Sequence, residues 1–346
     1  MSKNIIVGNG FSAFICKIFF KKNIEVLGVK NSNFFEKKTF FRRKNLNANK
    51  FFSHKSQSFG NLVYSLKNTR LHDRLSFGGN SNVWGGKINI KKLPKIFFKT
   101  IKSNKILLKK LSFKNTGTIS NDSSIMQLQN QKNQILDIKN TKINIKNGYL
   151  LNFTSKKNYL ILNYLSNKDS QIRKLKVRNL YLCIGTVQLI DLLYRSRYLK
   201  SGDIIKLSEF DHKFKLKFFF SKFDPNAITV VRYSFSRAIG HLLGIQYYSL
   251  FLKLLDFIPL VIDQNFYKKK NTCLLRINKN VLTDLNDVKF GNSIHYCNMI
   301  INGQNINKFL NKINKNIKGF GMPFVNQKKP GPISNEIIED VIQKLR

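Results

Sequence analysis

The chain has 346 residues, of which 42% are hydrophobic and 30 are Phe. A chain of this length and composition can bury a sizeable core, which excludes an intrinsically disordered protein. Its 61 Lys and Arg against 18 Asp and Glu give a formal net charge of +43. A charge of this size attracts phosphates, whether of nucleic acid, anionic lipid or a phosphorylated substrate.

The charge has a second explanation in the composition. Lys, Asn, Ile and Phe are abundant throughout, as in the product of a very A/T-rich gene, and the lysines are scattered rather than gathered on one arm. This explanation does not account for the shortage of Asp and Glu. We expect nonspecific contact with polyanions under either explanation. A basic nucleic-acid-binding protein rests on charge alone, because the sequence has no zinc-finger, helix-turn-helix or RNA-stacking motif.

The first residues superficially resemble a signal peptide, with the apolar stretch Ile5–Phe20 between Lys3 and Lys21. No small-residue cleavage site follows, and two glycines interrupt the stretch where a strand-to-helix turn would need them. The four cysteines form no CxxC pair and have no His at metal-like spacing. We therefore expect an uncleaved, cytoplasmic protein with free thiols and no metal site, and contact with a membrane surface stays open.

A strand, a helix and a second strand are predicted in the first 30 residues. Ile5–Val7 is a short apolar strand, a helix extends to about Lys22, and Glu25–Val29 is the second strand. This order is a βαβ opening of ordinary length.

The turn between the first strand and the helix has the spacing Gly8-x-Gly10-x-x-Ala13. In this pattern Gly8 permits a tight turn, Gly10 lets the backbone approach a pyrophosphate, and Ala13 keeps the helix close to the strand. The alternative is a glycine-rich turn that binds nothing. One feature disagrees with dinucleotide binding: Lys30 stands where an acidic residue would accept the ribose hydroxyls, and lysine accepts no hydrogen bond.

Residues 31–75 are polar and basic and are predicted to be an irregular connection. The chain then becomes glycine-dense, with a Trp between two glycine pairs. Four glycines in nine positions would let the backbone lie against a flat ligand, whereas the alternative is a glycine-rich surface loop. The candidate ligand-contacting residues of this stretch are Gly78, Gly79, Asn80, Ser81, Asn82, Trp84, Gly85 and Gly86.

Short strands or loops are expected from Ile101 to Asn147. Three strands follow, at Tyr149–Phe153, Tyr159–Tyr164 and Leu175–Ile184. The last leads through Gly185 into a helix that ends near Ser196, so the N-terminus of this helix would face an anion, unless it is a generic strand–helix unit.

Two helices are predicted in the second half of the chain. Apolar residues at spacings of three and four indicate one from Arg237 to about Phe266, and polar residues interrupt it too often for a membrane span. An interfacial helix flanked by Lys268–Lys270 is the alternative. The other helix is Ser334–Leu345, which carries Glu336 in its first turn and basic residues in its last.

Three segments of the chain together resemble the glucose–methanol–choline oxidoreductase family. They are the glycine-dense stretch Arg74–Gly86, the strand–turn–helix Asn179–Ser196 and the stretch Ser293–Met299. The resemblance implies noncovalent FAD, held by the early glycine turn, the glycine-dense stretch and Gly185. It also implies that His295 removes the alcohol proton while hydride passes to the flavin, although a structural histidine is the alternative.

The sequence departs from the family at three positions. Lys318 stands where the family has Asp, Gly331 where it has a second His or Asn, and Lys30 where it has an acidic residue. These departures support an alternative function, a catalytically decayed, flavoprotein-like binding module.

We therefore expect an α/β protein with a Rossmann-like FAD-binding domain and a smaller inserted α+β substrate domain. The flavin domain would comprise residues 1–205 and 288–346, and the insert residues 206–287. The expected reaction is oxidation of a hydroxyl group on a sugar or another polar alcohol by hydride transfer to FAD. The sequence leaves open the substrate, the electron acceptor and the oligomeric state.

Overall fold

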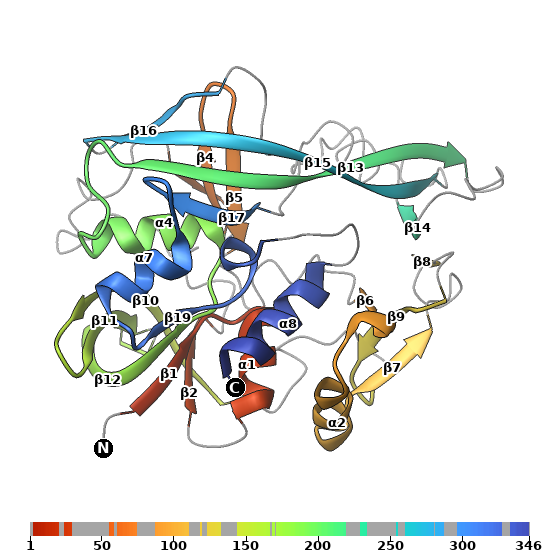
Figure 1. Cartoon of the computed structure of the whole chain (residues 1–346), viewed down its shortest axis with the longest axis horizontal. Coiled ribbons are helices and arrows are strands. Elements are labelled where there is room, and N and C mark those ends of the chain that lie inside the picture. Colours follow the sequence, from red (N-terminus) through yellow and green to blue (C-terminus); the bar gives the residue numbers. More distant parts are fainter. Residues whose placement is uncertain are drawn as a thin grey trace.

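The computed structural model describes most of the chain, and its strands form four sheets in the described ranges (Figure 1). These ranges are residues 3–20, 24–29, 55–58, 61–74, 87–110, 118–119, 123–132, 144–166, 168–169, 171–218, 229–233, 254, 260–279, 281–286, 296–326 and 333–345.

The chain begins with β1 (Lys3–Val7), α1 (Phe11–Phe20) and β2 (Ile24–Gly28), which confirms the predicted strand–helix–strand. The two strands are parallel, with Ile6 opposite Val26. Successive residues of β1 point to opposite faces of the sheet, as the period of a strand requires. Ile5 and Val7 enter one apolar core, and Ile6 enters another.

Three further strands lie where they were predicted, and β19 completes the first sheet. The predicted strands are β10 (Ile145–Ser155), β11 (Leu160–Ser166) and β12 (Ile172–Leu182), and the added strand is β19 (Ile317–Gly319). The start of β10 pairs parallel with β2, the end of β12 pairs parallel with β1, and β19 pairs parallel with β12. Because β10, β11 and β12 are joined antiparallel, strands β1, β2, β10, β11 and β12 close into a ring.

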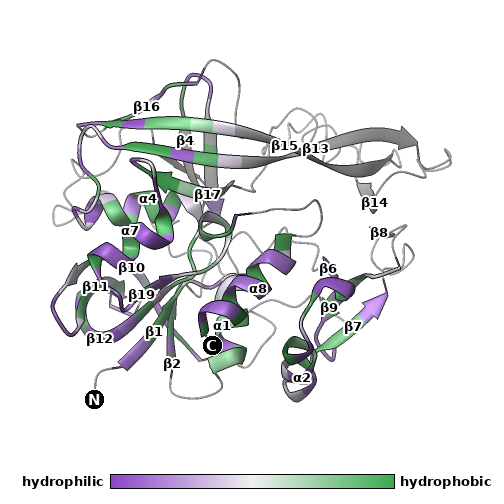
Figure 2. Cartoon of the chain, in the orientation of Figure 1, coloured by the Kyte–Doolittle hydropathy of each residue, from purple (hydrophilic) through white to green (hydrophobic). Residues whose placement is uncertain are grey.

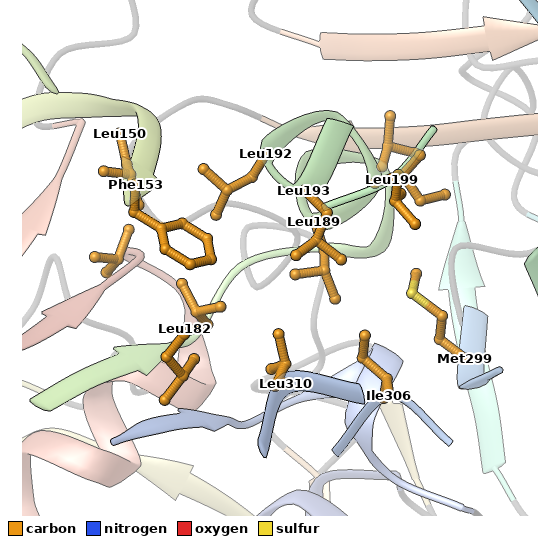
Figure 3. Packing of buried hydrophobic residues seen from close by; sticks show 14 of the residues in the cluster. Leu150, Phe153, Leu182, Leu189, Leu192, Leu193, Leu199, Met299, Ile306 and Leu310 are labelled. Atoms are coloured by element: carbon orange, nitrogen blue, oxygen red, sulfur yellow. The ribbon is translucent and has the colours of Figure 1, made fainter. Parts of the chain in front are cut away.

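Helices cover both faces of the parallel strands. On one face, α1 packs beside α8 (Ile333–Leu345), which was predicted at these residues (Figure 1). On the other face lie α4 (Thr186–Arg195), also as predicted, and α7 (Ile306–Ile313). Figure 3 shows the core on the α4 face, where leucines of α4 meet Phe153 of β10, Leu182 of β12 and Leu310 of α7.

The end of α8 is fixed to the first sheet by Lys344. Its Nζ lies 2.9 Å from Oδ2 of Asp340, and it donates to Oδ1 of Asn307 (2.9 Å) and to the carbonyl of Gly319 (2.8 Å). Burial raises the pKa of Asp340 and lowers that of Lys344, and each charge opposes the shift of the other. The contacts of this lysine join α7, α8 and β19.

The second sheet has seven strands, among them the two longest strands of the described chain, β13 and β15. Its members are β8 (Thr118–Ile119), β13 (Ile204–Phe218), β14 (Thr229–Tyr233), β15 (Leu260–Asn278), β16 (Val281–Asp284), β17 (Tyr296–Ile301) and β18 (Gln304–Asn305). The sheet therefore joins strands from the predicted insert to β17 and β18, and residues of β13 and β15 enter the core that contains α4.

The predicted helix from Arg237 to Phe266 is wrong at its end. Residues 260–266 belong to β15, which pairs with β13 from Leu260 to Arg276, because a long antiparallel partner outweighs local helix preference. Lys268–Lys270 also lie in β15, so they do not flank a helix at that end. The rest of the predicted helix, apart from Leu254, lies outside the described residues.

The predicted irregular connection over residues 31–75 is wrong for its last part. A three-stranded antiparallel sheet is formed there by β3 (Lys55–Ser58), β4 (Asn61–Ser65) and β5 (Arg70–Arg74). These strands are short and rich in polar residues, so their pattern gave no clear period of two.

A small peripheral unit follows, built of three antiparallel strands and a helix (Figure 1). It consists of β6 (Lys87–Asn89), the 3₁₀ turn η4 (Ile90–Lys92), α2 (Lys95–Ser103), β7 (Leu107–Lys110) and β9 (Ile125–Gln129). Asn335 of α8 holds this unit by two hydrogen bonds to the backbone of Asn89, each 2.8 Å long.

All four cysteines lie in the described residues, where they are buried and form no disulfide. Cys16 of α1 and Cys183, directly after β12, bring their sulfur atoms within 3.6 Å, and burial raises the pKa of Cys16 well above its ordinary value. They pack as small apolar side chains between α1 and the sheet. None of the helices in the described ranges is long and apolar enough to cross a bilayer.

Candidate dinucleotide site at the carboxyl edge

The parallel strands end at one edge of the first sheet. Val7 of β1 lies between Leu27 of β2 and Leu182 of β12, and Leu182 in turn pairs with Gly319 of β19. The turns that follow these strands therefore meet at the same edge. In α/β proteins with parallel strands, ligands commonly bind beyond the carboxyl ends of those strands.

Gly8 turns the chain from β1 toward α1 and cannot be replaced without strain. Its φ is +131°, a conformation that favours glycine, and a Cβ at this position would overlap the carbonyl oxygen of Cys183. The turn is fixed from both sides, since Gly8 donates to the carbonyl of Leu27 (2.9 Å) and Cys183 donates to that of Val7 (2.8 Å).

Asn9 closes the turn over the end of β2. Its Nδ2 donates to the carbonyl of Val29 at 2.7 Å. Below it lies Gly28, where an added Cβ would approach the Cβ of Asn9 to 2.9 Å. A side chain at Gly28 would thus push the turn away from β2.

Helix α1 begins directly at this edge. The amide of Phe14 donates to the carbonyl of Gly10 at 3.1 Å, which makes Gly10 the residue where the helix starts. The first turn of a helix presents backbone N–H groups and the positive end of the dipole, a combination that binds anions. Ala13 is fully buried in the core on the α1 face, where its small side chain lets the helix lie close to the sheet.

The turn after β19 reaches the start of the same helix. Gly321 has a φ of +101°, and an added Cβ would lie 2.5 Å from Oγ of Ser12. Lys318, where the family resemblance implies an Asp, donates through its exposed ammonium to the carbonyl of Lys344 at 2.6 Å. A cation at the C-terminal turn of α8 suits the helix dipole, so this lysine has a structural partner.

A small pocket, partly open to solvent, lies beside Gly8 at this edge. Its walls come from the ends of β1 and β2, from β10 and from α4. The lining residues are Val7, Gly8, Asn9, Leu27, Gly28, Val29, Gly148, Tyr149, Leu150, Ile184, Gln188, Leu192 and Arg195. The walls combine apolar side chains with amide, hydroxyl and guanidinium groups, and small-molecule sites contain both kinds of group.

The polar wall of the pocket is a buried cluster around Arg195. Its guanidinium lies 3.2 Å from Oδ2 of the fully buried Asp191 and 3.1 Å from the hydroxyl of Tyr149. Burial raises the pKa of Tyr149 to about 12, and the nearby Arg195 works against that rise. The hydroxyl of Tyr149 is therefore protonated at neutral pH, and the cluster is set before any ligand binds.

Gly185 also lies at this edge, at the N-terminus of α4, but a side chain of the protein already contacts that helix end. The amide of Gln188 donates to Oδ2 of the fully buried Asp73 at 3.0 Å. A Cβ on Gly185 would overlap this carboxylate. The anion at the N-terminus of α4 is therefore Asp73 of β5, at the position where the family resemblance implies the cofactor.

The structure thus brings Gly8, Gly10, Ala13 and Gly185 to one edge. The other predicted residues lie outside the described residues: Gly78, Gly79, Asn80, Ser81, Asn82, Trp84, Gly85, Gly86 and His295, together with Lys30 and Gly331. In the described part of the chain, no three His, Cys, Asp or Glu side chains gather as metal ligands would.

The polar residues of the pocket were not among the predicted site residues; they are Asn9, Tyr149, Gln188 and Arg195. Asn9 could have been noticed because it stands between the two glycines of the turn. Asp191 and Arg195 have the i,i+4 spacing of an ion pair within an otherwise apolar helix, which is also a usable signal. Nothing in the sequence links Tyr149 to them.

No protein-family model matches the sequence, and no curated protein matches it. Among solved structures, RebC soaked with K252c is similar over 92% of this chain and 55% of its own, with 8% identity and a TM-score of 0.31. CabE, an aromatic hydroxylase from angucycline biosynthesis, is similar over 75% of this chain and 43% of its own, with 9% identity and a TM-score of 0.25. The chain spans about half the length of these structures, and at such scores neither likeness assigns a function to it.

Proposed function

We propose that this chain is a flavoprotein that binds FAD at the carboxyl edge of a Rossmann-like sheet. One observation carries the proposal: a glycine-only turn, the start of α1 and a small, partly apolar pocket adjoin at the ends of β1 and β2. This is the combination that dinucleotides require, with amide donors for the phosphates and an apolar wall for the base.

The residues present fit the dinucleotide part of FAD. Gly8, Gly10 and the first amides of α1 would hold the pyrophosphate, and the pocket wall formed by Leu27, Val29 and Gln188 would hold the adenosine. The closely packed glycines support this assignment. At Gly148, as at Gly8 and Gly28, backbone stands where any side chain would collide, with an added Cβ only 2.8 Å from the carbonyl of Leu165.

The proposed reaction is oxidation of a hydroxyl group on a sugar or another polar alcohol. FAD, when bound, supplies the acceptor for the hydride. His295 would take the alcohol proton, and residues 78–86 would lie along the flavin, as the family resemblance implies. The division into a flavin domain (1–205 and 288–346) and a substrate domain (206–287) belongs to the same proposal.

A catalytically decayed binding module is the second candidate, motivated by Lys30, Lys318 and Gly331. For Lys318 the structure offers another explanation. Its ammonium contacts the last turn of α8, so the loss of an Asp there accompanies a gain in helix capping. This contact explains the substitution without a loss of cofactor.

Flavin content tests the proposal. Wild type, Gly10→Val and the control Gly303→Ala are purified, exposed to FAD and compared at equal folded fraction by flavin absorbance. We expect wild type and the control to retain flavin, because Gly303 is a turn glycine with no neighbour within 4 Å. Gly10→Val should lose it, since a branched side chain would stand where the phosphates approach the backbone.

Equal flavin in the Gly10→Val variant and wild type would contradict the assigned position. A wild type that takes up no FAD would exclude both flavin-binding functions. A wild type that binds FAD but reduces it with no alcohol or sugar of a broad panel would favour the decayed module.

A further inference from the structure

The peripheral unit formed by β6, η4, α2, β7 and β9 carries an uninterrupted run of positive charge. Nine lysines and no Asp or Glu occur from Lys87 to Lys110. Eight of these lysines are exposed, and we call them the basic face: Lys91, Lys92, Lys95, Lys99, Lys102, Lys105, Lys109 and Lys110. They lie on η4, α2, β7 and the turn that joins α2 to β7.

Helix α2 is two-sided. Phe97, Thr100 and Ile101 are buried, whereas Lys95, Lys99 and Lys102 are exposed at the four- and three-residue spacings that place them on one side. Figure 2 shows the same alternation of hydrophobic and hydrophilic residues along α2. The helix packs inward through its aromatic and aliphatic residues and presents its lysines outward.

An apolar side chain stands among these lysines. Ile96 is 38% exposed between Lys95 and the buried Phe97, and few other large apolar side chains of the described chain are as exposed. Removing an exposed isoleucine side chain from water is favourable. A partner that is both anionic and apolar would therefore bind the lysines and also bury Ile96.

The charge of the basic face is not neutralised by the described part of the protein, where no Asp or Glu pairs with any of the eight lysines. The density of lysine is also high. Nine lysines in the 24 residues from Lys87 to Lys110 compare with 61 Lys and Arg in the 346 residues of the chain, which is about twice the general share. The charge on this unit therefore exceeds what general composition alone would place there.

We propose that the basic face binds the surface of an anionic lipid bilayer, with α2 lying on the membrane and Ile96 inserted among the acyl chains. Clusters of four to eight lysines attract anionic headgroups, and Ile96, which is next to Lys99 at a spacing of three residues, adds an apolar side chain at the edge of the basic face. Nucleic acid fits less well. Its phosphates would leave Ile96 in water, and the face has no arginine, the residue whose fork matches phosphate geometry.

The test is sedimentation with vesicles of phosphatidylcholine alone and of phosphatidylcholine mixed equally with phosphatidylserine, at low and high salt. The lysine variant is Lys95→Gln/Lys99→Gln/Lys102→Gln. Its control, Lys156→Gln/Lys157→Gln/Lys174→Gln, removes the same charge from exposed lysines on the strands β10 to β12 and their turns. The apolar variant is Ile96→Asn, and its control is Ile172→Asn, since Ile172 on β12 is 45% exposed.

We expect wild type to bind only the vesicles that contain phosphatidylserine, and less so at high salt. The lysine variant should bind on the order of a hundredfold more weakly, because each of the three lysines contributes about fivefold at such a surface. Ile96→Asn should lose about tenfold through the insertion that it removes. Both controls should bind nearly as wild type does, and thermal unfolding should show that all variants are folded.

Three outcomes would overturn the proposal. The first is a wild type that ignores phosphatidylserine. The second is equal loss in the lysine variant and its control, which would assign binding to net charge. The third is an Ile96→Asn variant that binds lipid like wild type. If the lysine variant then also binds duplex DNA more weakly than wild type does, the basic face would be assigned to nucleic acid.

Discussion

The carboxylate of Asp73 lies against Gly185, in the space that any side chain at position 185 would fill. Asp73 belongs to β5 and Gly185 immediately precedes α4, so this contact joins the three-stranded sheet to the helix that lines the pocket. Because Asp73 accepts the amide of Gln188, it acts as the N-terminal cap that the sequence around Gly185 lacks.

Replacing Asp73 by Asn should destabilise the protein by about 1–2 kcal/mol. The change removes a negative charge from the N-terminus of α4 and weakens its hydrogen bond to Gln188. Urea unfolding monitored by circular dichroism measures the loss. Asp169→Asn is the control, since it breaks an exposed ion pair that should be worth less than about 1 kcal/mol. Equal effects of the two substitutions would show that Asp73 does not cap the helix.

Gly8→Ala should lower the free energy of unfolding far more than Gly303→Ala does, although both glycines have positive φ. At Gly303 the added methyl meets nothing, so only the left-handed backbone is penalised, by about 1–2 kcal/mol. At Gly8 the methyl also overlaps the carbonyl of Cys183, which should bring the total to roughly 3–5 kcal/mol. Melting temperatures of the two variants check this, and matching values would contradict the close approach of β12 to the turn.

Lys87 should make stability depend on pH in the alkaline range. Burial lowers its pKa from an ordinary 10.5 to about 8 in the folded protein. Between these values the unfolded chain binds the proton that the folded chain has released, so stability rises with pH. Below about pH 8 the whole cost of burying the charge is present.

Lys87→Met should therefore raise the free energy of unfolding at pH 7 by up to about 3 kcal/mol and flatten the alkaline rise. Chemical denaturation at pH 7, 8.5 and 10 follows the difference from wild type. Lys91→Met removes an exposed lysine of the same unit and serves as the control. If the free energy of unfolding of Lys87→Met rose with pH in parallel with that of wild type, Lys87 would not be the source of the alkaline pH dependence.

His295→Ala tests the proposed base, provided that wild type binds FAD. The variant should keep its fold and its flavin but reduce the flavin about 100- to 10,000-fold more slowly, because a positioned base contributes that much. Single-turnover bleaching of the flavin isolates this step from reoxidation. The wild-type rate should increase as the imidazole loses its proton, and the variant should lack this dependence. Reduction at the wild-type rate would make His295 structural.

Local patterns in the sequence predicted the elements whose cores form from neighbouring residues. The strands β1 and β2, helix α1, the three strands β10 to β12 and helices α4 and α8 all lie where their apolar spacing placed them. The early glycine turn was predicted for the same reason, since its spacing and position are visible within a dozen residues.

Elements that depend on distant partners were not predictable in this way. Asp73 is buried because a helix that starts more than a hundred residues later supplies its donor. β15 is a strand because β13 pairs with it, although its first residues continue a helical pattern. The polar wall of the pocket forms only when β10 brings Tyr149 to Arg195 of α4. In each case the deciding interaction has no trace in the local sequence.

The ring of strands has a consequence for the order in which the chain folds. Ile5 pairs with Glu25 on one side and with Leu180 on the other. During synthesis, β1 and β2 therefore emerge early but keep an open edge until β12 leaves the ribosome, and β12 then waits for β19. Such distant pairings slow folding and leave edges available to other nascent chains. The turn at Gly8, near the start of the chain, thus becomes rigid only after more than half of the chain has been made, because Cys183 must arrive to hold it.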